Sequence, residues 1–118
     1  MKRMNKIFAI SSTGKSEKSF LDLRFGKCEI IVIYNSEKKE SFIIDNPFKN
    51  SDRSGIQLVN FLDEQGVSVI ITGEAGPQVI SMLKKKKLQL VLMHEEKIKI
   101  EDIITRINSK SRISKVRD

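Results

Sequence analysis

The chain has 118 residues, with 39% hydrophobic residues, a net charge of +7 and a single cysteine. A chain of this length suits one domain built around one hydrophobic core. The lone cysteine excludes an internal disulfide, and no apolar run approaches the roughly 20 residues of a membrane-spanning helix. No N-terminal stretch has the form of a secretory signal. We therefore expect a cytoplasmic, globular protein without a membrane segment.

The first half of the chain predicts three strands and a helix. Residues 6–11 form a short apolar run, and residues 29–35 are rich in Ile and Val without alternation, which indicates a central strand buried on both faces. Residues 40–45 follow closely enough to pair with them as a hairpin, and Pro47 ends that strand. Over residues 51–66 the apolar spacing becomes helical, which predicts an amphipathic helix that ends at a glycine.

The second half predicts two more strands, each followed by a helix. Residues 67–72 form a buried strand, and a turn with two glycines leads to Pro77, a residue favoured at the first position of a helix. Residues 88–93 give the last strand, and residues 100–107 give a short helix. We expect residues 108–118 to form a basic, disordered tail outside the single domain of residues 1–107, because they contain few apolar groups.

This order of elements predicts an α/β fold with a five-stranded mixed sheet. A meander followed by right-handed crossovers gives the strand order 3-2-1-4-5, with only the second strand antiparallel and helices on both faces. The loop before the second strand and the turn after the fourth then lie at one edge of the sheet. Ligands of open α/β sheets commonly bind at that edge.

The turn of residues 72–77, with the sequence TGEAGP, is one candidate site at this edge. Its glycines permit close backbone approach, and the following helix presents free N–H groups to an anion. The alternative is that the glycines serve only the geometry of the turn. The turn is no P-loop, because the Lys-Ser/Thr ending is missing.

Cys28 is the second candidate at this edge. The nearby cations Arg24 and Lys27 would lower the pKa of its thiol and favour metal ligation, although a cysteine that opens a strand is more often a packing residue. His94, the only histidine, has no partner at metal-ligand spacing. The predicted first and fourth strands carry no carboxylate, which excludes a two-metal nuclease. No catalytic set can be assigned, so we expect a protein that is not an enzyme.

Basic residues form two clusters, Lys84–Lys87 and the tail of residues 110–117. The simplest interpretation of the lysine run is a solvated last helical turn beside the negative end of the helix dipole. The alternative is an interaction module that binds nucleic acid or an acidic protein and holds no metal cofactor. With one Tyr and no Trp, base stacking has little support, so nucleic acid is the less favoured partner.

Several segments together resemble the dinitrogenase iron-molybdenum cofactor biosynthesis family, the NifX-like domain. They are KIFAISSTGK, LRFGKCEIIVIY, IDNPF, GIQLVNFLDEQGVSVIITGEAGPQVISMLKK and IEDIITRI, and they span roughly residues 5–107. The resemblance implies a three-layer ribonuclease-H-like fold and a non-enzymatic carrier for an iron–sulfur or iron–molybdenum cofactor precursor in nitrogen fixation. It also implies metallocluster donor or acceptor proteins as partners of a monomer or weak homodimer.

The resemblance also implies a set of site residues. The family's motif before the second strand often carries a histidine ligand, which the segment of residues 24–28 lacks, and Cys28 offers a replacement sulfur donor to the metal. One protein sulfur cannot complete a cluster, so the cargo must bring its own ligands or be shared by two chains. The cofactor-binding residues expected are Arg24, Gly26, Cys28, Thr72, Gly73 and Gly76.

Overall fold

The computed structural model describes residues 6–95 and 97–117, of which 110–117 are described by their backbone alone. Its elements follow the order expected from the sequence. The strands are β1 (Ile7–Ser12), β2 (Ile30–Asn35), β3 (Glu40–Asp45), β4 (Val69–Thr72) and β5 (Gln89–Leu92). The helices are α1 (Ser54–Glu64), α2 (Pro77–Lys86) and α3 (Ile100–Arg117).

The five strands form one mixed sheet in the order β3-β2-β1-β4-β5. β2 is antiparallel to both of its neighbours, whereas β1, β4 and β5 are parallel to one another. The predicted order and the reversal of the second strand alone are therefore confirmed. The ribonuclease-H-like name for this fold stays a prediction.

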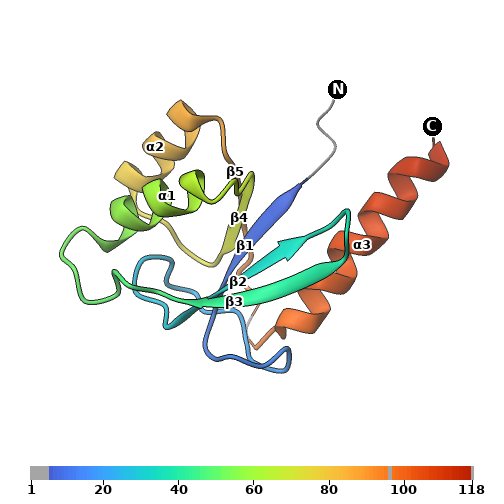
Figure 1. Cartoon of the computed structure of the whole chain (residues 1–118), viewed down its shortest axis with the longest axis horizontal. Coiled ribbons are helices and arrows are strands. Elements are labelled where there is room, and N and C mark those ends of the chain that lie inside the picture. Colours follow the sequence, from blue (N-terminus) through green and yellow to red (C-terminus); the bar gives the residue numbers. More distant parts are fainter. Residues whose placement is uncertain (1–5, 96, 118) are drawn as a thin grey trace.

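The sheet lies between two helical layers (Figure 1). On one face, α1 and α2 cover the sheet, and Leu58 and Leu62 of α1 are completely buried against it. On the other face α3 packs through Ile100 and Ile103. These pairs lie three or four positions apart, so each helix turns one apolar side to the sheet. Burial of each such side chain contributes about 1.5–3 kcal/mol.

The third helix is longer than the sequence predicted. α3 continues to Arg117, whereas we expected it to end near residue 107. No glycine or proline interrupts residues 108–117, so the segment contains no residue that would end the helix. The division of the chain at residue 107 into a domain and a tail stays a prediction. None of the described helices is long and apolar enough to span a membrane.

Candidate functional site

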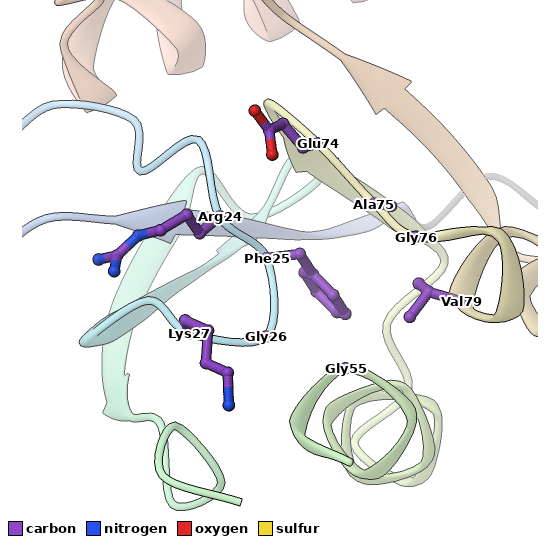
Figure 2. A pocket seen from close by; sticks show the side chains of 9 residues that line it. All are labelled: Arg24, Phe25, Gly26, Lys27, Gly55, Glu74, Ala75, Gly76 and Val79. Carbon is purple, nitrogen blue, oxygen red and sulfur yellow. The ribbon is translucent and has the colours of Figure 1, made fainter. Parts of the chain in front are cut away.

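A surface cleft of about 440 Å³ lies where the loop before β2 meets the N-terminal ends of α1 and α2. Phe25 and Val79 point toward each other across it, whereas the charged ends of Arg24, Lys27 and Glu74 point outward at its rim (Figure 2). Its volume lies in the range of small-molecule sites. The lining residues are Arg24, Phe25, Gly26, Lys27, Gly55, Glu74, Ala75, Gly76 and Val79.

The two loops that the topology was expected to bring together do meet here. The backbones of Arg24 and Glu74 pair in an isolated parallel bridge, which joins the loop before β2 to the turn after β4. Both segments belong to the edge at which β1 and β4 end, because β2 runs in the opposite direction and begins there. The loop that leads into the reversed second strand therefore forms one wall of the cleft.

Two glycines let the walls of the cleft approach each other. A Cβ on Gly26 would lie 2.7 Å from the backbone N of Gly55 and 2.6 Å from Ser54 Oγ. A Cβ on Gly55 would in turn lie 2.7 Å from Val79 Cγ2. All three distances are shorter than the contacts that a real Cβ makes. The predicted site residue Gly26 therefore lines the cleft, and it also sets the spacing between the loop and α1.

Two helix N-termini face this space without a capping side chain. The N-cap residues of α1 and α2 are Arg53 and Gly76, and neither helix has a side-chain cap or an acidic first turn among the described residues. The first N–H groups of a helix lack internal partners and carry a partial positive charge. The cleft therefore offers hydrogen-bond donors to an anion, as expected for the turn that ends at Gly76.

A buried carboxylate fixes the loop at Arg24. Asp22 is almost fully buried and accepts hydrogen bonds from Arg24 Nε (3.2 Å), Nη2 (3.1 Å) and backbone N (3.0 Å). The hydrogen bond and the charge of Asp22 raise the pKa of the Arg24 guanidinium above its ordinary value. Asp22 thereby offsets much of the positive charge that Arg24 was expected to bring, so the helix ends and Lys27, which also lines the cleft, are left to attract an anion.

Thr72 and Gly73 do not line the cleft. Thr72 is fully buried, and its Oγ1 lies 2.8 Å from Ser11 Oγ, which also donates to the carbonyl oxygen of Asp22 at 2.6 Å. A Cβ on Gly73 would lie 2.7 Å from Leu23 Cα, so this glycine permits close packing of two backbones. Of the expected turn residues, Gly76 faces the cleft, whereas Thr72 and Gly73 support the wall behind it.

Cys28 lies beneath the cleft and has no exposed surface. Its thiol donates to the carbonyl oxygen of Phe25 at 3.2 Å. Burial, with a smaller contribution from the charge of Asp22, raises the pKa of Cys28 to about 12, so the group is a neutral thiol near pH 7. The sequence predicted a lowered pKa and a metal-ligating thiolate. In this conformation the sulfur cannot contact a ligand, because the packed core encloses it.

Asn46 is the positioning residue that the sequence did not reveal. Its buried Nδ2 donates to the carbonyl oxygens of Gly26 (3.0 Å) and Cys28 (2.9 Å), while its Oδ1 accepts from the N–H of Phe48 (2.9 Å). These bonds fix the loop before β2. Asn46 follows Gly26 by 20 positions and Cys28 by 18 positions in the sequence. The Asn-Pro pair after β3, part of the IDNPF segment, was the available signal, but the sequence assigned no contact to its side chains.

The remaining candidates lie outside the cleft. The lysines Lys84–Lys86 occupy the last turn of α2, at the opposite end of the helix from the cleft, and Lys86 pairs with Asp63 at 3.3 Å. His94 is exposed and does not line the cleft. Among the described residues, no group of three or more His, Cys, Asp or Glu side chains could hold a metal ion.

These features define a small open-sheet α/β domain with a cleft at the edge where its parallel strands end. The chain belongs to the dinitrogenase iron-molybdenum cofactor family, whose model matches residues 4–110. This match confirms the resemblance seen in the sequence. No curated protein sequence matches the chain.

Solved structures with a similar fold include two that differ in source. The apo form of the orange protein from Desulfovibrio gigas has a TM-score of 0.80 and 20% identity, covering 93% of this chain and 92% of its own. A protein from Thermotoga provisionally named NifB has a TM-score of 0.74 and 23% identity, covering 88% of each chain. At these identities the likeness shows the fold alone.

Proposed function

We propose that the protein is a non-catalytic carrier for an anionic iron–sulfur or iron–molybdenum cofactor precursor, which it binds in the cleft. Membership of the dinitrogenase iron-molybdenum cofactor family supports this class of cargo. The observation that carries the proposal is that two helix N-termini without a side-chain cap line one surface cleft, through Gly55 in the first turn of α1 and Gly76 before α2. Such ends bind anions through their free N–H groups.

The residues of the cleft suit a cargo whose metals are already fully ligated. The described residues offer no cluster of metal ligands, and the one thiol is enclosed in the core. The protein would therefore contact the outer surface of the cargo. Phe25 and Val79, both largely buried, form the apolar floor that polarisable sulfide would contact, and the helix ends would hydrogen-bond to its negative charge.

A carrier of this kind receives and releases its cargo without breaking bonds to protein ligands. Its partners would be the proteins that donate and accept the metallocluster. Because the binding forces are hydrogen bonds, charge and apolar contact, added salt should weaken the electrostatic part and leave the apolar contact. Ligation by a thiolate would respond far less to salt.

Substitution of Gly76 tests the proposal, because a Cβ at this position meets no atom within 4 Å. Asp and Asn are both favoured N-cap residues, so Gly76→Asp and Gly76→Asn should both fold. A thiolate-capped 4Fe–4S dianion, titrated anaerobically, is the probe. We expect Gly76→Asp to bind it at least about tenfold more weakly than Gly76→Asn, since the two differ by one negative charge in the cleft. If Gly76→Asn binds the probe and Gly76→Asp binds it equally well, the proposal is contradicted.

A further inference from the structure

β3 forms one edge of the sheet and lacks the usual protection of an exposed edge strand (Figure 1). Its register with β2 is regular over six residues, with no bulge, and its four central residues, 41–44, carry no charge or proline. Phe42 is 61% exposed and Ile43 is 42% exposed. The opposite edge, β5, is shorter and follows four consecutive lysines. Natural edge strands are usually protected by charge, proline or a bulge, so β3 is suited to pairing.

The hydrogen-bonding pattern shows which backbone groups of β3 face outward. The N–H of Asn46 donates to the carbonyl oxygen of Glu29 at 3.0 Å, so these two residues form a hydrogen-bonded pair with β2. In antiparallel strands such pairs alternate with residues whose N–H and C=O point away from the partner strand. Ser41, Ile43 and Asp45 therefore present their N–H and C=O groups at the outer edge, where no described segment pairs with them.

We infer that β3 binds β3 of a second copy of this chain, antiparallel and around a two-fold axis at Phe42. This register places Phe42 opposite Phe42 of the second copy as a non-hydrogen-bonded pair, the type in which side chains lie closest. Ser41 lies opposite Ile43 of the second copy and can exchange both backbone hydrogen bonds with it. The two sheets would then form one continuous sheet across the axis.

Charge complementarity selects a second copy in this register. The axis at Phe42 brings Lys39, the last residue of the turn before β3, beside Asp45 of the second copy, and symmetry makes this pair twice. Both side chains are exposed, and neither has an ion pair within the described part of the chain. Moving the axis to Ile43 would place Lys39 opposite Pro47, which has no N–H, and would bring neither charged residue of β3 opposite a cation.

Sedimentation equilibrium over a range of concentrations tests the inference. We expect the average mass to rise from 13.5 kDa toward about 27 kDa with concentration. Asp45→Lys and Lys39→Asp should each weaken association about tenfold, because each change places like charges opposite one another at two symmetry-related positions. Lys39 has φ of +57°, a conformation that Asp tolerates well, so the variant should fold.

The double variant Lys39→Asp/Asp45→Lys restores opposite charges and should return the association toward the wild-type strength. Ile43→Pro removes an outward N–H that the monomer does not use, and it should abolish the dimer while leaving the monomer folded. A mass that stays at 13.5 kDa at every concentration would overturn the inference. So would a dimer that none of these variants weakens, or a double variant as weak as the two single variants.

Discussion

Replacing Gly26 by alanine should destabilise the protein, because the new methyl group has no room between the loop and α1. The added Cβ would lie 2.7 Å from the backbone N and 2.9 Å from the Cα of Gly55, neither of which can rotate away. Overpacking of this kind costs about 1–3 kcal/mol. The loss of chain entropy in the unfolded state offsets about 0.4–1 kcal/mol. The net loss of unfolding free energy is then about 1–2 kcal/mol.

Thermal unfolding followed by circular dichroism measures this effect. With an unfolding entropy of about 2.1 cal/mol/K per residue, each kcal/mol lowers the Tm of this chain by about 4 °C, so Gly26→Ala should lower it by about 4–8 °C. Gly76→Ala is the matched control in the same cleft, because a Cβ there meets no atom within 4 Å, and its Tm should stay within about 2 °C of wild type. A Gly26→Ala variant as stable as Gly76→Ala would refute the steric argument.

Three further outcomes are expected. Asn46→Ala should lower the free energy of unfolding in urea by about 2–4 kcal/mol, because it leaves the carbonyls of Gly26 and Cys28 without their donor; an effect below 1 kcal/mol would contradict that role. Thr72→Val should cost about 1 kcal/mol on the same scale through the lost hydroxyl contacts, and cargo binding should be unchanged because Thr72 does not line the cleft. The pKa of Cys28 rises from 9.0 to about 12 on folding, so the thiol's contribution to stability is present below pH 9 and should be lost as the pH rises toward 12. Cys28→Ala should lack this part of the pH dependence, and a matching decline in both proteins would contradict the assignment.

The strand order and both helical layers could be predicted from the sequence, because they depend on local patterns. Apolar runs of strand length, helical spacing around Leu58 and the short link between β2 and β3 each act within a few residues. Right-handed crossovers then leave few ways to order the strands. The same rules correctly placed the loop before β2 beside the turn after β4, which is why the location of the cleft could be predicted.

The roles of individual side chains at that edge could not be predicted in the same way. The cations near Cys28 in the sequence favoured a thiolate. In the structure Arg24 bonds to Asp22, and the thiol lies in a core cluster with residues of α1, such as Leu58, which comes 30 positions after Cys28. Thr72 bonds to Ser11 across 61 positions of the chain. Such contacts depend on the tertiary packing, and one sequence carries no local signal for them.

The most direct test of the central claim is to locate the bound cargo by amide NMR signals during anaerobic titration with the thiolate-capped 4Fe–4S dianion. The claim is that the two helix N-termini at the cleft hold the cargo without the Cys28 thiolate. We predict that the amides of Gly26, Gly55, Gly76 and Val79 shift or broaden first, with the same pattern in Cys28→Ala. Changes centred on Lys84–Lys87, or a loss of all changes in Cys28→Ala, would contradict it.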